Sequence, residues 1–136
     1  MTEGLSTDEI VAVAEFRAAL RSFQRKAEQT ARRAGLTPQR HLLLLMIRGA
    51  PDGSEQSTVT ELAERLRLAQ STVTELVRRA EEAGLIEREP SRSDGRVAHL
   101  RVSEEGERRL AQVVQHLDAE REELRVAFAH LEGASS

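Results

Sequence analysis

The order of segments in residues 58–102 constrains the fold of this chain more than any other feature. Two short amphipathic segments, 58–66 and 70–84, are followed by two strand-like segments, 85–89 and 97–102, around a polar turn. This pattern predicts two helices crossing at a steep angle and then a β-hairpin. It is the layout of a winged helix-turn-helix, which presents one helix to a DNA groove. Contacts between the helices are expected from Leu62, Ala63, Leu66, Leu68, Val73 and Leu76, with Leu68 turned inward.

Length and composition narrow the class of protein. A chain of 136 residues is expected to form one domain with a single core. It has no cysteine, which excludes disulfides, thiolate metal sites and thiol-based redox sensing. No apolar run approaches a membrane span, and no secretory signal is visible, so we expect a cytoplasmic location without membrane contact. No glycine-rich phosphate loop or local Ser/His/acid pattern indicates an enzyme.

The charge is distributed unevenly along the chain. The formal net charge is −3, but residues 65–101 carry eight arginines against six acidic residues, a net of +2, which leaves −5 for the remainder. This distribution indicates a basic face on an acidic body, which attracts phosphate to one surface.

Capping signals place the other elements. Ser6 begins a first helix that is expected to run to about Ala34, with Gly35 as its stop. Thr37, followed by proline, begins a second helix, of which residues 41–47 should be the most buried part. Thr58 begins the next helix, and residues 56–57 are expected to add a short strand to the hairpin.

The last helix is expected to run unbroken from its cap at Ser103 to about Glu132. A seven-residue leucine repeat suggests that it packs along another helix, either the first helix of the same chain or a second copy. Both terminal helices are too long for a 45-residue DNA-binding core to bury their apolar faces. A second copy of the chain could cover the remainder, which favours a homodimer. The expected dimerisation residues are Val13, Phe16, Leu110, Leu117, Leu124, Phe128 and Leu131.

Five sequence runs resemble the MarR family of bacterial transcription regulators. They are TELAERL (60–66), QSTVTELV (70–77), AGLIER (83–88), SDGRV (93–97) and LRVSEEG (100–106). The resemblance implies a mainly α fold with a small β-hairpin wing. It also implies a winged region at 37–102 and a two-fold dimer built from helices in 1–36 and 103–136. Such dimers read a pseudo-palindromic operator and repress until a small ligand binds. The chain departs from the pattern at Ala69, where relatives often have a capping side chain, and in lacking a further short C-terminal helix.

The predicted DNA contacts lie on the second helix of the pair and on the turn of the hairpin. Hydroxyl, amide and guanidinium groups suit base edges and phosphates. Glu75 is expected either to accept from a cytosine amino group or to pair with a neighbouring arginine. The family pattern implies that Asp94 fixes the wing arginine at 96. The candidate residues are Gln70, Ser71, Thr72, Thr74, Arg78, Arg79, Arg92, Asp94 and Arg96.

Ligand and metal sites are less marked. The resemblance implies an effector pocket that Phe16, Leu20, Gln39, His41 and Met46 could line, although each also fits a core role. His116 and Glu120 stand one helical turn apart, but two ligands do not make a closed metal site. We therefore expect no metal and no cofactor. The alternatives are a metal-responsive regulator of the same fold, an activator, and a winged-helix protein-interaction module that does not bind DNA.

Overall fold

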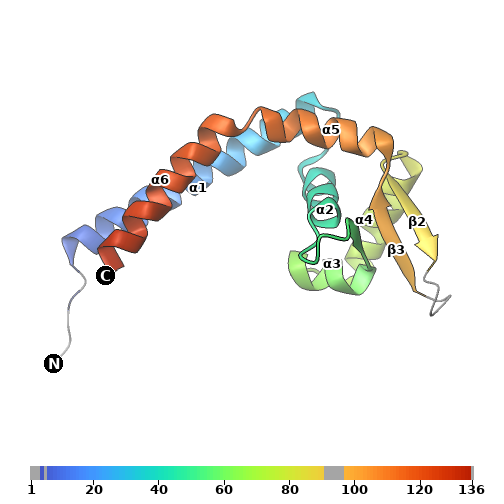
Figure 1. Ribbon diagram of the computed structural model, residues 1–136, viewed down its shortest axis with the longest axis horizontal. Coiled ribbons are helices and arrows are strands. Elements are labelled where there is room, and N and C mark those ends of the chain that lie inside the picture. The colour runs from blue at the N-terminus through green and yellow to red at the C-terminus, as the bar shows by residue number, and fades with distance from the viewer. Residues whose placement is uncertain (1–3, 5, 91–96, 136) are drawn as a thin grey trace.

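The computed structural model describes residues 4, 6–90 and 97–135, which form a helical arm and a winged region (Figure 1). The arm consists of α1 (Thr7–Arg33) and α6 (Asp118–Ser135), which lie side by side. The winged region contains α2 (Pro38–Arg48), β1 (Gln56–Ser57), α3 (Val59–Leu66), α4 (Gln70–Glu82), β2 (Ile86–Pro90) and β3 (Ala98–Val102). Helix α5 (Glu104–Gln115) joins the two parts. The predicted fold, mainly α with a small antiparallel sheet, is confirmed.

The helices begin where the sequence places their caps. The hydroxyls of Ser6, Thr37 and Ser103 accept hydrogen bonds from amides three residues on, each at 3.1 Å. Thr58 and Glu61 form the expected reciprocal capping box, with distances of 3.2 and 2.9 Å. These bonds satisfy amides that the helix itself cannot pair.

The sheet has the strand order β1-β3-β2, with both pairings antiparallel. Ser57 lies opposite Leu100, and Ile86 lies opposite Val102. The short strand predicted at residues 56–57 is therefore present at the edge of the hairpin. Residues 91–96 of the polar turn predicted between the two strands lie outside the described residues.

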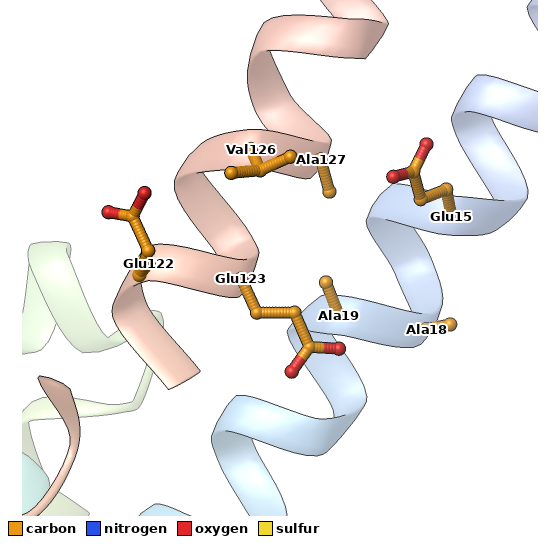
Figure 2. Close-up of a pocket in the computed structure, with 7 residues that line it drawn as sticks. All are labelled: Glu15, Ala18, Ala19, Glu122, Glu123, Val126 and Ala127. Carbon is orange, nitrogen blue, oxygen red and sulfur yellow. The ribbon is translucent and has the colours of Figure 1, made fainter. Parts of the chain in front are cut away.

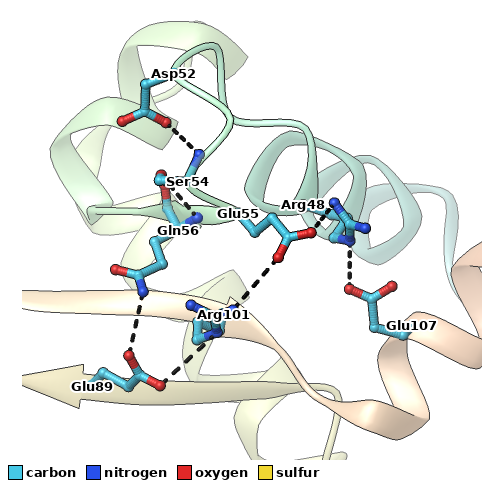
Figure 3. A network of polar contacts seen from close by, with 8 residues as sticks. All are labelled: Arg48, Asp52, Ser54, Glu55, Gln56, Glu89, Arg101 and Glu107. Atoms are coloured by element: carbon cyan, nitrogen blue, oxygen red, sulfur yellow. Dashed lines mark hydrogen bonds and ion pairs between the residues drawn. The ribbon is translucent and has the colours of Figure 1, made fainter.

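A network of ion pairs fixes this sheet to α2 and α5 (Figure 3). Arg48, at the end of α2, contacts Glu55 and Glu107, with nitrogen–oxygen distances of 2.6 Å to each. Glu55 also lies 3.6 Å from Arg101 of β3, which in turn lies 3.9 Å from Glu89 of β2. One guanidinium thus links the loop before β1 to the first turn of α5.

The core lies between α2, the helix pair α3–α4 and the sheet. Leu43, Leu44 and Ile47 of α2 are fully buried there, as predicted for this segment, although Leu42 is 44% exposed. The same core contains Leu62, Val73, Val77, Leu85 and Leu100.

The prediction that Leu68 turns inward is wrong, because its side chain is 41% exposed. The chain leaves α3 through Arg67 in the left-handed conformation (φ 58°), and the Leu68 amide donates to the Ala63 carbonyl at 3.1 Å. This turn closes the end of α3 with backbone bonds. Leu62 and Val73 fill the space between the helices instead.

The prediction of one unbroken C-terminal helix is also wrong. The amides of His116 and Leu117 donate to carbonyls three residues back, at 3.2 Å each, and a new helix starts at Asp118. The break lets α5 pack on the winged region while α6 follows α1. Leu110 and Leu117 are buried in the core of the single chain, which leaves them little surface for a partner.

Candidate nucleic-acid interface

Helix α4 separates its residues cleanly into an inner and an outer face. Val73, Val77 and Ala80, spaced three and four residues apart, are completely buried against the core. The remaining positions place the predicted helix contacts together on the exposed side. We call these residues the α4 outer row: Gln70, Ser71, Thr72, Thr74, Arg78 and Arg79.

The first turn of α4 has no side-chain cap. Ala69, at the cap position, makes no side-chain hydrogen bond, unlike the caps of α1, α2, α3 and α5. The Gln70 amide group instead donates to the Thr60 hydroxyl at 3.3 Å, which ties the start of α4 to α3. The uncapped amides and the positive end of the helix dipole together suit a phosphate oxygen.

The two arginines of the α4 outer row are held by carboxylates. Arg78 forms a two-pronged pair with Glu75, with Nε–Oε2 and Nη2–Oε1 distances of 2.9 and 2.5 Å, and Arg79 Nε lies 3.0 Å from Glu75. These hydrogen bonds lower the pKa of Glu75 to about 2. They also raise the pKa of Arg78 above its usual value. The predicted pairing of Glu75 with its neighbours is therefore present.

Other arginines near this surface also have partners. Arg88 of β2 donates from Nε to both oxygens of Glu81, at 2.8 and 2.9 Å. Arg65 donates to the carbonyl of Met46 at 2.9 Å. Neither contact is predicted from the sequence. Helical spacing could not have indicated them, because each joins two different elements.

The predicted wing contacts, Arg92, Asp94 and Arg96, lie outside the described residues. The strands that carry this turn are described, and β2 and β3 pair along their full length.

The winged region matches a known family. Residues 34–97, which include α2, β1, α3, α4 and β2, match the model of the MarR family. The winged region of the chain is therefore of the MarR type. No curated protein shows significant sequence similarity to the chain.

Solved structures share this fold over most of the chain. The transcriptional regulator Tm0710 from Thermotoga maritima is 27% identical, with a TM-score of 0.66, covering 79% of this chain and 73% of its own. AbsC, a MarR-family regulator from Streptomyces coelicolor, is 22% identical, with a TM-score of 0.64 and coverages of 96% and 84%. A point mutant of MarR from E. coli, crystallised with operator DNA, is 20% identical, with a TM-score of 0.65 and coverages of 90% and 85%.

Outside the matched region, large apolar side chains are exposed on the arm. Five of the eight that are exposed among the described residues lie there: Ile10, Val11, Val13, Val126 and Phe128. The rings of Phe16 and Phe128 meet at a centroid distance of 6.1 Å across α1 and α6. Val13 and Phe128, both predicted dimerisation residues, are each about half exposed. Leu124 and Leu131 are partly buried.

A cavity of about 330 Å³ lies between the two helices of the arm (Figure 2). Ala18, Ala19 and Ala127 line its apolar part, while Glu15, Glu122 and Glu123 stand around it. Glu15 contacts His130 at 3.0 Å, and Glu122 pairs with Arg125. The acidic surroundings make this part of the arm unsuitable for phosphate.

The residues predicted for an effector pocket lie on different elements. Phe16 and Leu20 are half-buried on α1, Gln39 is exposed at the start of α2, and Met46 packs against the core. His41 is 7% exposed, its Nε2 has no hydrogen-bond partner among the described residues, and burial lowers its pKa below the ordinary value.

Metal-binding clusters and membrane-spanning helices can be assessed for the described residues only. There, no three His, Asp or Glu side chains gather into a metal site, and the His116 ring contacts the Gln112 carbonyl at 2.6 Å. No helix in the described ranges has the length and apolar character needed to cross a bilayer.

Proposed function

We propose that this chain is a regulator of the MarR family, which controls transcription by binding specific double-stranded DNA as a homodimer. The observation that carries the proposal is the α4 outer row, a continuous exposed face of hydroxyl, amide and guanidinium groups on the second helix of a winged helix-turn-helix. An α-helix of this kind fits the major groove, where such groups read base edges.

The geometry of the helix start supports this placement. Ser71 and Thr72 stand in the first turn of α4, beside amides that no side chain caps. In the proposed complex, these amides and hydroxyls position the helix against a phosphate, while residues further along the outer row contact bases. Arg92 and Arg96 of the wing then contact the backbone or the minor groove.

The exposed apolar residues of the arm support the homodimer. Val13 and Phe128 are exposed on α1 and α6, the two helices of the arm, where a second arm would cover them. A two-fold dimer would place its two α4 helices in half-sites about one helical turn, roughly 34 Å, apart. The MarR mutant complexed with operator DNA and a DNA complex of MepR from S. aureus are precedents for such binding among similar folds.

The regulatory direction follows the family resemblance. We propose that the dimer represses its promoter in the bacterial cytoplasm and that a small ligand releases it by changing the distance between the two α4 helices. This release is tested by measuring that distance with and without a ligand selected for dissociating the complex. An unchanged distance contradicts it.

DNA binding itself is tested by fluorescence anisotropy on the DNA upstream of the protein's own gene, titrated with salt. We expect tight binding that weakens steeply as salt rises, because phosphate contacts release counterions. Arg96→Ala should weaken binding further, whereas Arg125→Ala, the same change on the arm, should leave it unaltered. Absence of binding at low salt, both to this DNA and to random duplexes, contradicts the proposal and points to a protein-interaction module.

A further inference from the structure

The charge of α4 is unusual for a helix that faces phosphate. Between Gln70 and Glu82 it carries Arg78 and Arg79 against Glu75, Glu81 and Glu82, a net of −1. The side-chain charges of the helix therefore contribute no net attraction for a polyanion, and only the positive end of its dipole does. The described arginines of residues 65–101 for which no ion pair is found are Arg65, in the last turn of α3, and Arg67, in the turn before α4.

Arg78 is engaged at all three nitrogens of its guanidinium. Besides the two-pronged pair with Glu75, its Nη1 lies 2.5 Å from Oε1 of Glu82. The side chains of Glu75, Arg78 and Glu82 are each about half exposed or more, so these ion pairs lie on the solvent-facing side of α4. Because the carboxylates are three residues before and four residues after Arg78, the helix itself holds the arrangement.

This arrangement opposes binding to arbitrary DNA. A phosphate that approaches Arg78 must displace the Glu75 carboxylate, or remain close to it and be repelled by its negative charge. Glu75 also faces unfavourable contacts with the many acceptor atoms of the major groove, such as guanine N7 and O6 and thymine O4. Its ionised form persists at neutral pH, since Arg78 and Arg79 keep its pKa far below that range.

One base pair satisfies both members of the Glu75–Arg78 pair. The amino group of cytosine donates to a carboxylate, and the guanine paired with it presents the N7 and O6 acceptors that suit a guanidinium. We infer that Glu75 is a specificity-determining residue, which penalises binding to non-cognate DNA and, together with Arg78, selects a C·G pair in each half-site. This inference rests on the proposed function and assigns a discriminating role to one residue of that interface.

The test compares the wild type with Glu75→Gln and Glu82→Gln by selection of half-sites from a random duplex pool. Both variants remove one negative charge that contacts Arg78, but only Glu75→Gln removes the two-pronged pair. For Glu75→Gln we expect loss of a C·G preference at one position. The ratio of affinities for selected and random DNA should fall about 5- to 100-fold. The salt dependence should steepen by about one phosphate contact, because Arg78 becomes available.

The outcomes separate this inference from the function on which it rests. Glu82→Gln should retain the wild-type half-site and ratio. If Glu75→Gln selects the same half-site with an unchanged ratio, or loses all DNA binding, the inference is overturned while DNA binding by the wild type stands. A wild type that binds no duplex overturns both.

Discussion

At the scale of single residues, Gly106 marks the closest approach of α5 to the sheet. A Cβ atom there would lie 2.4 Å from the Leu85 carbonyl oxygen and 2.7 Å from Cγ1 of Val102. The Leu85 oxygen cannot yield readily, because it accepts the Ser103 amide at 2.9 Å. We expect Gly106→Ala to lower the free energy of unfolding by about 1–3 kcal/mol, as overpacking does.

Urea denaturation followed by circular dichroism measures this loss. Gly133→Ala is the matched control, because a Cβ at Gly133 would meet no atom within 4 Å. Equal stability of the two variants would contradict the close packing at Gly106.

His41 gives the fold a dependence on pH. Burial lowers its pKa in the folded chain below the ordinary value of 6.5, which it keeps when unfolded. Between the two values the unfolded chain binds more protons, so stability is complete above about pH 6.5 and falls as the pH drops below it. We expect His41→Gln to lose this acid-dependent part of the unfolding free energy.

The measurement is the midpoint of urea unfolding at intervals between pH 5 and 8. His99→Gln leaves His41 in place and should retain the wild-type slope. A slope that is the same in the wild type and in His41→Gln would show that other groups cause the acid dependence.

At the scale of elements, the helix-turn-helix is held by residues within its helices and not by its turn. Leu62 is fully buried, whereas Leu68 is largely at the surface. We expect Leu62→Ala to cost about 2–5 kcal/mol of unfolding free energy. Leu68→Ala should cost less than about 1 kcal/mol. Thermal or urea unfolding measures the loss of unfolding free energy in each variant. Equal losses would indicate that Leu68 is turned inward after all.

The start of α4 lacks a side-chain cap, which lowers the stability of the helix but leaves its first amides free to bind a phosphate. An aspartate at position 69 would cap the helix, and we expect Ala69→Asp to raise the unfolding free energy by about 1 kcal/mol. The same carboxylate would occupy the amides and repel phosphate, so affinity for DNA should fall. Ala69→Ser, which caps without charge, should stabilise the helix with a smaller loss of affinity. Stability and DNA affinity that rise together in Ala69→Asp would contradict this use of the helix start.

The sequence predicts those elements whose signals are local. The caps at Ser6, Thr37 and Ser103 are read correctly because each bond joins residues three apart. The exposed face of α4 follows in the same way from the spacing of its buried residues. The break at residues 116–117 contains no proline or glycine. It is set by how α5 and α6 pack on different partners, so no local signal marks it. Cross-element contacts such as Arg88 with Glu81 escape prediction for the same reason.

At the scale of the whole molecule, the arm carries most of the large apolar side chains that a single described chain leaves exposed. Phe128 is 49% exposed, although its ring already touches Phe16. For the proposed homodimer we expect a solution mass of twice the 15.1 kDa chain. Phe128→Glu should shift the mass towards one chain, because a buried unpaired carboxylate is costly.

Analytical ultracentrifugation at micromolar concentration measures this shift. Leu68→Glu places the same charge on an exposed leucine outside the arm and should leave the dimer intact. A wild type that sediments as a single chain would contradict the homodimer.

The break between α5 and α6 is a point at which the direction of α6 relative to α5 can change. Helix α6 has 18 residues and is therefore about 27 Å long. A change of about 10° at residues 116–117 would sweep its far end through an arc of roughly 5 Å, more than the rise of about 3.4 Å between base pairs. In the proposed dimer, held together by its arms, a change of this angle would alter the fit to operator length.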